Sequence, residues 1–357
     1  MESRRTIFPT AFHILDSMLN KAVIDLRVIR KNALNVKAKL KKSTRLCAVV
    51  KADGYGHGAQ KIASAIYNVA DCFAVALSEE GVSLRFSGID KDILVLTPCL
   101  SKDDTLRAIA YGLTLTVDSF SRLKQVAECA RQINKTAFVH VKFNSGMNRY
   151  GTDSLEEVKK ICDFIQKTPC VKLTGIYSHL ANPQNKSSLN IGVNKFLLAN
   201  NLVKGYNNKV ISHISASGGF LQGVEFDMVR IGILLYGYKP FDSSLVKVKP
   251  AMKVYSPIVC ERSLKKGQTA LYGDLRLEKN LDLSLVRYGY ADGLPRNSLP
   301  SQFNNRCMDV TATTEIKCGK YGALVMDNAD RLAKLYHTIS YEILTKSAIR
   351  AEKIYIT

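Results

Sequence analysis

The chain has 357 residues, 46% of them hydrophobic, and carries a formal net charge of +20 at pH 7. This length exceeds the roughly 100–200 residues usual for one domain, so we expect one large domain and a smaller one. No stretch approaches the roughly 20 consecutive apolar residues that cross a bilayer, so we expect a soluble protein and no membrane partner.

The cysteines and histidines exclude two further classes of protein. The nine cysteines are an odd number without a C-x-x-C pair, which argues against a disulfide framework or a zinc ribbon and favours reduced thiols in the cytoplasm. The six histidines show no H-E-x-x-H or comparable spacing, so we expect no metal site. Residues 1–21 contain a pair of arginines but no apolar segment after it, and we interpret them as an ordinary leader.

The positive charge is the one unusual feature of the composition, because a basic protein can bind nucleic acid. Here the lysines are spread along the whole chain, the densest cluster lies at residues 37–45, and no basic-aromatic recognition motif stands out. We therefore expect no nucleic-acid partner. A nucleic-acid binder would instead show strong, salt-sensitive retention on DNA.

The first large domain is predicted from an alternation of short β-branched runs with longer stretches of helical spacing. In one such stretch the apolar residues of 120–133 fall on one helix face, with Asp118 as the predicted N-cap. Eight strands, each followed by a helix, predict a TIM-type (β/α)8 barrel over residues 22–240. The eight candidate strands are residues 46–51, 72–76, 93–97, 113–117, 137–143, 171–178, 210–214 and 228–231.

The pattern changes after residue 240, where strands follow one another without intervening helices. Residues 241–357 are therefore predicted to form a mainly β domain, and an early strand at residues 22–26 is a candidate to pair with it. Residues 265–268 are predicted to form a turn. The candidate strands of this domain are residues 252–264, 282–288, 307–314 and 349–356.

Chemistry in such a barrel lies at the C-terminal ends of the strands, where Lys51, Arg149, His179 and Ser217 are all expected. Lys51 follows a buried strand in the run AVVKADGYGHG, residues 48–58. A partly desolvated lysine suits Schiff-base chemistry, whereas a lysine that merely snorkels from the strand end is the alternative. The run resembles the pyridoxal phosphate lysine motif of the alanine racemase family.

Further segments match the same family in the same order, so the resemblance extends from residue 22 to the C-terminus. It implies pyridoxal 5'-phosphate as the cofactor, held by Lys51, and a homodimer whose active sites are shared between the subunits. The matching segments are VKFNSGMNRYG at 141–151, GIYSHLA at 175–181, HISASGG at 213–219, VRIGILLYG at 229–237, ALYG at 270–273 and RCMD at 306–309.

The resemblance assigns the cations first. It implies that Arg149 pairs with the substrate carboxylate, a role that suits a planar, permanently charged guanidinium. It also implies that Lys142 matches a lysine that is often carried as a carbamate. Asn144 stands where the family usually has aspartate, so one nearby negative charge is lost.

The cofactor ring and its phosphate are assigned in the same way. By resemblance, His179 lies beside the ring and bonds towards Arg230 and the catalytic tyrosine, although a satisfied core histidine is the alternative. Arg230 would donate to the pyridine nitrogen, and since arginine keeps its proton, the cofactor would be a weaker electron sink. Ala216 stands where the family commonly has asparagine. The residues implied to hold the phosphate are Ser217, Gly232, Ile233, Tyr55 and Tyr341.

The β domain supplies the remaining groups. By resemblance, Tyr272 reaches the barrel site of the partner subunit as the second base, and the backbone of Met308 contacts the substrate carboxylate. Inversion at Cα needs a base on each face, which Lys51 and Tyr272 would provide. The resemblance thus implies an isomerase that interconverts L-alanine and D-alanine and supplies D-alanine for peptidoglycan.

Two other activities remain open at this stage. A racemase of the same fold with a wider pocket could prefer serine or larger amino acids; Tyr341 argues against it, and Asn144 and Ala216 keep it open. A non-catalytic protein that carries pyridoxal phosphate on a barrel alone is the second alternative, and the β domain with Tyr272 argues against it.

Overall fold

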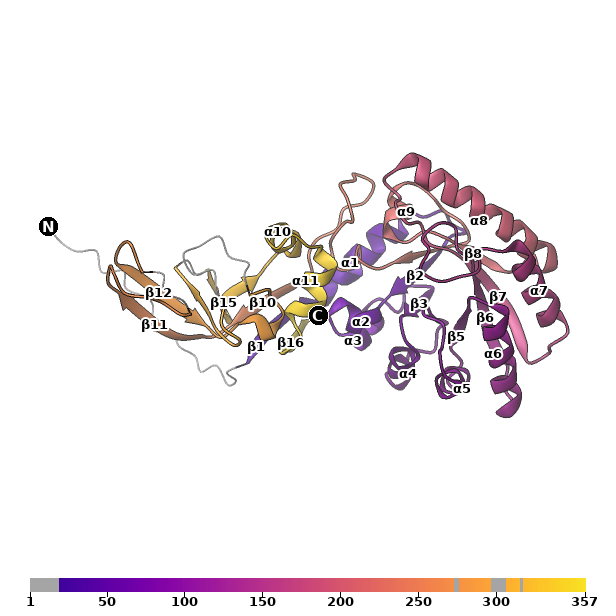
Figure 1. Ribbon diagram of the computed structural model, residues 1–357, viewed down its shortest axis with the longest axis horizontal. Coiled ribbons are helices and arrows are strands. Elements are labelled where there is room, and N and C mark those ends of the chain that lie inside the picture. The colour runs from indigo at the N-terminus through magenta and orange to yellow at the C-terminus, as the bar shows by residue number, and fades with distance from the viewer. Residues whose placement is uncertain (1–18, 273–275, 297–305, 315–316) are drawn as a thin grey trace.

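A computed structural model describes residues 19–272, 276–296, 306–314 and 317–357 of the chain. Of the predicted leader at 1–21, residues 1–18 lie outside the described residues. Residue 20 already belongs to a strand. The molecule is elongated, with a helix-covered barrel at one end and a mainly β domain at the other (Figure 1). The predicted fold class is confirmed.

The barrel contains eight parallel strands, as predicted: β2 (Arg45–Val49), β3 (Cys72–Val75), β4 (Ile93–Val95), β5 (Thr114–Val117), β6 (Ala137–Lys142), β7 (Val171–Tyr177), β8 (Ile211–His213) and β9 (Met228–Ile231). They pair in the order β8-β7-β6-β5-β4-β3-β2-β9. A bridge between Ala216 and Arg230 joins the two ends of this order, so the barrel is nearly closed.

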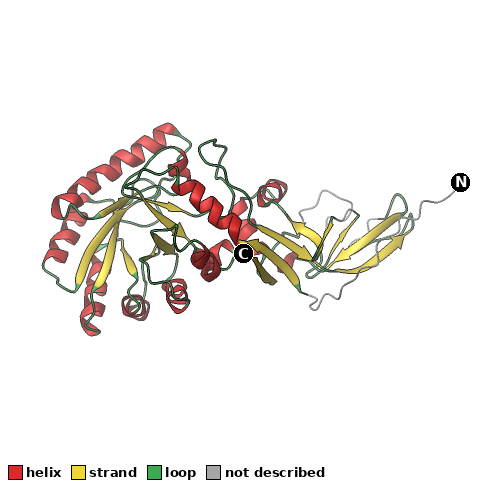
Figure 2. Ribbon diagram, turned by 180° about the vertical axis from the view of Figure 1, so that it is seen from behind, coloured by secondary structure: helices red, strands yellow, loops and turns green. Residues whose placement is uncertain are grey.

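Helices cover the outer face of the barrel (Figure 2). In the helix after β6, the residues Val158, Ile161, Cys162 and Ile165 recur at helical spacing and are buried against the strands. The helices are α1 (Leu26–Lys37), α2 (Lys51–Tyr55), α3 (Ala59–Ala65), α4 (Ser78–Phe86), α5 (Lys102–Ala110), α6 (Phe120–Gln132), α7 (Leu155–Gln166), α8 (Lys186–Tyr206) and α9 (Ser217–Leu221).

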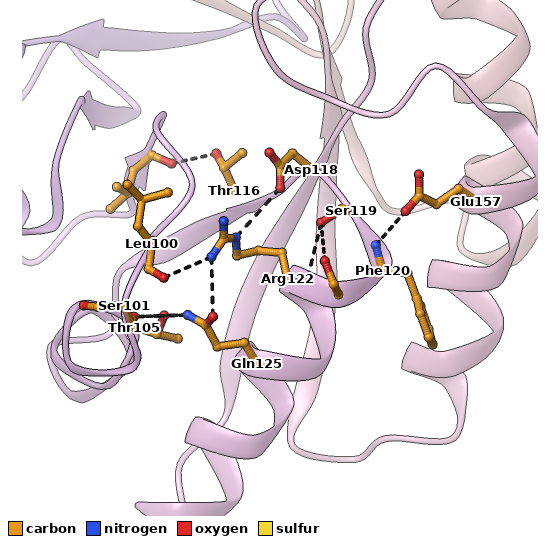
Figure 3. A network of polar contacts seen from close by, with 12 residues as sticks. Leu100, Ser101, Thr105, Thr116, Asp118, Ser119, Phe120, Arg122, Gln125 and Glu157 are labelled. Atoms are coloured by element: carbon orange, nitrogen blue, oxygen red, sulfur yellow. Dashed lines mark hydrogen bonds and ion pairs between the residues drawn. The ribbon is translucent and has the colours of Figure 1, made fainter.

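The start of α6 differs from the prediction by one residue (Figure 3). The N-cap is Ser119, whose hydroxyl accepts from the amide of Arg122 at 3.3 Å, and Asp118 is not the cap. Asp118 instead forms an ion pair with Arg122 at 3.9 Å. Glu157 from α7 accepts from the amide of Phe120 at 2.9 Å, so a neighbouring helix satisfies a donor of the first turn.

The described part of the β domain contains two sheets, two α-helices and one short 3-10 helix. One sheet has the strand order β14 (Cys318–Gly319), β15 (Gly322–Met326), β10 (Met252–Ser256), β1 (Asn20–Asp25) and β16 (Ala351–Ile356). The other contains β11 (Ile258–Leu264), β12 (Leu281–Val286) and β13 (Thr311–Thr313). β1 pairs with β10 antiparallel and with β16 parallel. The helical segments are η1 (Tyr290–Asp292), α10 (Ala329–Leu335) and α11 (Ser340–Ser347).

Two predicted strands of this domain are wrong in extent. Residues 252–264 form β10 and β11, which lie in different sheets, because Pro257 lies between them and has no N–H for a ladder. Of residues 307–314, only β13 is a strand. The carbonyls of Cys307 and Met308 accept instead from the amides of Tyr290 and Ala291, so this segment bonds to η1.

The β domain contacts the barrel beside the turn that follows β2. The ring of Tyr341 on α11 lies 5.9 Å from the ring of Tyr55. Gly56 has φ of 80°, and a Cβ at this position would lie 2.4 Å from the carbonyl oxygen of Leu344. Lys353 on β16 pairs with Asp53 at 2.6 Å. These contacts place α11 at the mouth of the barrel.

Candidate active site

A cavity of about 580 Å³ opens at the C-terminal ends of the barrel strands, next to α11. Its charged lining is cationic, with Lys51, Arg149 and Arg230 against Glu342. Such a lining favours an anionic ligand. The structure brings together the predicted residues Lys51, Tyr55, Lys142, Arg149, His179, Ser217, Arg230, Gly232, Ile233 and Tyr341.

Lys51 lies directly beyond β2, on a turn with an unusual backbone. Ala52 and Asp53 have φ of 51° and 52°, and Tyr55 has φ of 53°, values that side chains other than glycine rarely adopt. Glu80 supports this turn by accepting from the amide of Ala52 at 2.5 Å. Burial, reinforced by the charge of Arg149, lowers the pKa of Lys51 below its usual 10.5. The lysine is thus partly desolvated, as a nucleophilic or basic amine requires.

Arg230 lies on β9 and is 3% exposed. Its Nη1 donates to Nδ1 of His213 at 2.6 Å, and its Nη2 donates to the carbonyl of Ser178 at 2.7 Å. Nη2 also lies 3.4 Å from Nδ1 of His179. The hydrogen bonds of Arg230 to described residues use only Nη1 and Nη2, so its Nε–H has no acceptor among these residues.

Behind Arg230, two histidines form a chain inside the barrel that the sequence analysis did not assign. Burial, then the charge of Arg230, lowers the pKa of His213 well below 6.5, so the ring is neutral. Since Nδ1 accepts from Arg230, the proton lies on Nε2 and is donated to Nδ1 of His140 at 2.9 Å. The sequence carried one signal for His140: it alternates with apolar residues along β6, as does Lys142, so both side chains point to the same face of the strand.

Lys142 is 4% exposed, so its amine is buried beneath the cavity. Burial, then the charges of Arg230 and Arg149, lowers the pKa of this amine to about 6. Nζ lies 4.8 Å from the centre of the Tyr177 ring and 3.4 Å from the carbonyl oxygen of Phe143. At neutral pH the group is therefore an uncharged amine, which is the form that reacts with electrophiles.

The loop that carries Arg149 is organised by Asn144. The side-chain oxygen of Asn144 accepts from the amides of Gly146 and Asn148, at 3.2 and 3.0 Å. Its Nδ2 donates to Oδ1 of Asp153 at 2.6 Å. An aspartate at position 144 would place two carboxylates in contact, so Asp153 explains why an amide suits this position.

The predicted phosphate-binding residues lie on the side of the cavity nearest α11. The amide of Gly232 donates to Oγ of Ser217 at 3.4 Å. A Cβ at position 232 would lie 2.5 Å from the hydroxyl of Tyr55, so only glycine allows this approach. The rings of Tyr55 and Tyr236 stack with their centroids 4.7 Å apart. Burial raises the pKa of Tyr341 to about 12, so its hydroxyl keeps its proton and can donate a hydrogen bond.

Tyr272 and Met308 do not line this cavity within one chain. Both lie in the β domain, where their side chains are 63% and 54% exposed. The strands β11 and β12, which flank Tyr272 in sequence, lie at the end of the molecule farthest from the barrel (Figure 1). If either residue reaches a barrel cavity, that cavity belongs to another copy of the chain.

The described part of the chain holds no group of three or more histidine, cysteine or acidic residues placed to bind a metal ion. Within the same residues, no helix has the length and apolar character needed to cross a membrane.

Comparison with known proteins identifies related chains along nearly the whole sequence. Residues 24–240 match the model of the alanine racemase N-terminal domain, and residues 251–355 match that of the alanine racemase C-terminal domain. Alanine racemase from Clostridium tetani is 31% identical over 94% of this chain and 95% of its own length. Alanine racemase from Treponema denticola is 33% identical over 78% of this chain and 76% of its own.

Solved structures agree with these matches. Alanine racemase of Clostridium difficile superposes with a TM-score of 0.88 at 29% identity, covering 95% of this chain and 96% of that one. The Bacillus anthracis enzyme, described with bound L-Ala-P, superposes with a TM-score of 0.85 at 26% identity and covers 96% of both chains. Fold, site and relatives define an amino-acid racemase, which is an isomerase. The chain belongs to the alanine racemase family.

Proposed function

We propose that this protein racemises alanine with pyridoxal 5'-phosphate, using Lys51 and the partner subunit's copy of Tyr272 as the two bases. The observation that carries the proposal is the partly desolvated Lys51 in a cationic cavity that also holds Arg230 and Arg149. The names of the relatives support alanine as the substrate.

The cavity residues fit this cofactor. Lys51 would supply the amine for its aldehyde, Arg230 would donate to the ring nitrogen through Nε, and Ser217 with Gly232 would hold the phosphate. When bound, pyridoxal phosphate supplies an electron sink for the charge left at Cα after its proton is removed.

Arg230 and the histidines behind it hold the protons in fixed places. The neutral His213 accepts from Nη1, so it helps to keep the guanidinium oriented, and arginine itself does not give up its proton at physiological pH. As a donor that keeps its proton, Arg230 would bind the ring nitrogen without protonating it. This arrangement would limit side reactions that need a strong electron sink and would favour simple proton exchange.

Arg149 and the two bases would act on the substrate. Arg149 lies at the cavity, where its guanidinium can bind a carboxylate, and the backbone of Met308 from the partner would complete that contact. Lys51, whose lowered pKa leaves more of the free amine, would move the proton on one face of Cα. Tyr272 would act on the opposite face, and the uncharged amine of Lys142 would add to carbon dioxide with loss of a proton, giving a carbamate that orients Arg149.

The wider setting follows from the same proposal. We propose a homodimer; this is supported by the absence of Tyr272 and Met308 from the described lining of their own chain's cavity. It works in the cytoplasm, as the free state of all nine cysteines supports. Its product D-alanine serves peptidoglycan synthesis.

The test follows solvent deuterium at Cα of L-alanine, with chiral analysis of the product. Wild type should yield labelled D-alanine. Tyr272→Phe should slow inversion about a hundredfold or more while keeping the absorbance of the bound cofactor. Tyr111→Phe, another exposed tyrosine that lies on the barrel away from the cavity, is the matched control and should behave as wild type. Cofactor binding without exchange or inversion of alanine would disprove alanine as the substrate, and a panel of other amino acids would follow.

Mixed dimers test the sharing of sites. Lys51→Ala and Tyr272→Phe should each show little activity alone, but a hybrid dimer would have one site with both bases intact. Random mixing should therefore restore about a quarter of the wild-type activity. If both bases came from one chain, mixing would restore none.

A further inference from the structure

A buried histidine on the turn after Lys51 takes no part in the chemistry proposed above. His57 is 0% exposed and does not belong to the described lining of the barrel cavity. Its Nδ1 lies 2.9 Å from the carbonyl oxygen of Tyr55, whereas its Nε2 is buried and has no hydrogen-bond partner among the described residues. Burial lowers the pKa of His57 to about 4, so at physiological pH the ring is neutral and carries one proton.

The neighbours of this ring locate its proton. A carbonyl oxygen can only accept, so Nδ1 carries the proton and donates it to the carbonyl of Tyr55. Nε2 is then a buried acceptor without a donor among the described residues, which is unfavourable. A phenylalanine would offer a ring of similar size without an empty acceptor, so packing alone does not explain a histidine at position 57. The hydrogen bond from Nδ1 is what a phenylalanine could not provide.

This hydrogen bond holds a peptide unit with an unusual backbone. Tyr55 has φ of 53°, in the left-handed region, and the following Gly56 has φ of 80°. The N–H of Gly56 donates to the carbonyl of Ala52 at 3.0 Å, and the carbonyl of Tyr55 accepts from His57. The peptide unit between Tyr55 and Gly56 is therefore held at both ends. Because glycine tolerates many backbone angles, this unit could rotate if its carbonyl were released.

The side chain of Tyr55 extends from this peptide unit to the barrel cavity, which it lines. Its ring lies 4.7 Å from the ring of Tyr236, and the ring of His57 lies 4.6 Å from that same ring. Its hydroxyl lies beside Gly232, where a Cβ would come within 2.5 Å of it. Burial raises the pKa of Tyr55, so the hydroxyl keeps its proton and can donate a hydrogen bond. The direction of this donor depends on the backbone at residue 55.

We propose that His57 is a positioning residue, which holds the hydroxyl of Tyr55 in place for the phosphate of pyridoxal 5'-phosphate by binding the backbone carbonyl of Tyr55. The inference rests on the proposed function, because it requires this cofactor in the barrel cavity. His57 does not line that cavity, so it acts only through Tyr55. Its contribution therefore depends on the phosphate, and pyridoxal, which lacks the phosphate, should bind almost equally well without it.

The affinities for these two compounds test the proposal. The full chain is freed of cofactor and titrated with pyridoxal 5'-phosphate and with pyridoxal, and binding is followed by absorbance. His57→Phe should raise the dissociation constant of pyridoxal phosphate about tenfold, and that of pyridoxal less than about twofold, because only the hydrogen bond to the phosphate is lost. His337→Phe is the matched control and should change neither value, since His337 is exposed and also has a left-handed backbone, with φ of 51°.

His57→Asn separates positioning from packing. An asparagine amide can donate from nearly the place of Nδ1, but it lacks the ring that packs beside Tyr236. Cofactor-free His57→Asn should therefore unfold at a lower temperature than His57→Phe, because it leaves a cavity, and yet it should bind pyridoxal phosphate more tightly. If His57 served packing alone, the less stable variant would also bind the cofactor more weakly, and the proposal would be wrong.

Tyr55→Phe tests whether His57 acts through the hydroxyl of Tyr55. Once that hydroxyl is removed, adding His57→Phe should weaken the binding of pyridoxal phosphate no further. Equal losses of affinity for pyridoxal phosphate and pyridoxal in His57→Phe, or no loss for either, would overturn the proposal. Failure of wild type to bind pyridoxal phosphate at all would instead disprove the cofactor itself. His57→Leu, which also lacks the donor, replaces His57→Phe if that variant does not fold.

Discussion

Lys142 illustrates at the residue scale how burial changes an amine without any change in its covalent structure. It is enclosed by the barrel, lies near Arg230 and Arg149, and has its pKa lowered to about 6. In the unfolded chain the same amine keeps its usual pKa, 10.5. Between these values the unfolded state binds the extra proton, so folding becomes more favourable as the pH rises.

We therefore expect the stability of wild type relative to Lys142→Met to rise with pH from about 6 towards 10.5. Below pH 6 the difference should be constant, because both states are then protonated. The measurement is urea unfolding of both proteins in buffer free of carbon dioxide. Parallel pH profiles of the two proteins would show that Lys142 stays charged in the fold. Added ¹³C-bicarbonate should give a carbamate resonance in wild type alone.

The sequence predicted which residues line the cavity, but it did not predict the hydrogen bonds that hold these residues in place. Lys51, Arg149, His179 and Ser217 each follow an apolar strand, and barrel topology places such ends on one face, so their common cavity could be predicted. The contact of His213 with Arg230 could not be predicted, because it depends on the register of β8 against β9 inside the barrel. The pairing of Asn144 with Asp153 is likewise a product of loop geometry.

At the scale of elements, the start of α6 tests how a helix N-terminus is held (Figure 3). Ser119→Ala removes the acceptor for the amide of Arg122 and should lower the free energy of unfolding by about 1 kcal/mol. Asp118→Asn removes only an ion pair with Arg122 at 3.9 Å, so it should lower the free energy of unfolding by less than about 0.5 kcal/mol. Urea unfolding of both variants gives the comparison. A larger loss in Asp118→Asn would reverse the assignment of the cap.

The barrel strands were predicted more accurately than those of the β domain, and the reason is physical. Barrel strands are buried on both sides and read as apolar runs with helices between them. In the β domain, five of the seven residues of β11 are exposed, so its sequence shows no buried face, and the two-residue β14 is too short for a pattern. The break at Pro257 carried a local signal, because proline cannot continue a ladder.

At the scale of the whole molecule, Asn20 connects the beginning of the chain to the β domain. Its amide donates to Asp292 at 2.9 Å, and its carbonyl accepts from Ser256 at 2.8 Å, all three side chains being buried. Asn20→Ala would leave the carboxylate of Asp292 and the hydroxyl of Ser256 without this partner. The free energy of unfolding of the β domain should therefore fall by about 2 kcal/mol or more.

Hydrogen exchange should show this loss locally. Amides of β10 and β16 should exchange faster in Asn20→Ala, while those of β4 and β5 in the barrel should not change. Asn35→Ala is the control, because Asn35 makes one exposed bond to the carbonyl of Lys247 at 2.8 Å. Uniformly faster exchange in both domains would show that they unfold as one unit.

The place of β1 in its sheet also sets the order of events during translation. β1 is made before every barrel strand, yet both of its neighbours, β10 and β16, are made after the barrel is complete. The barrel can therefore fold on the ribosome while β1 still lacks its sheet, and the last residues of the chain close the second domain. A product that ended before residue 351 would keep its barrel but expose β1 along one edge, where it could pair with other nascent chains.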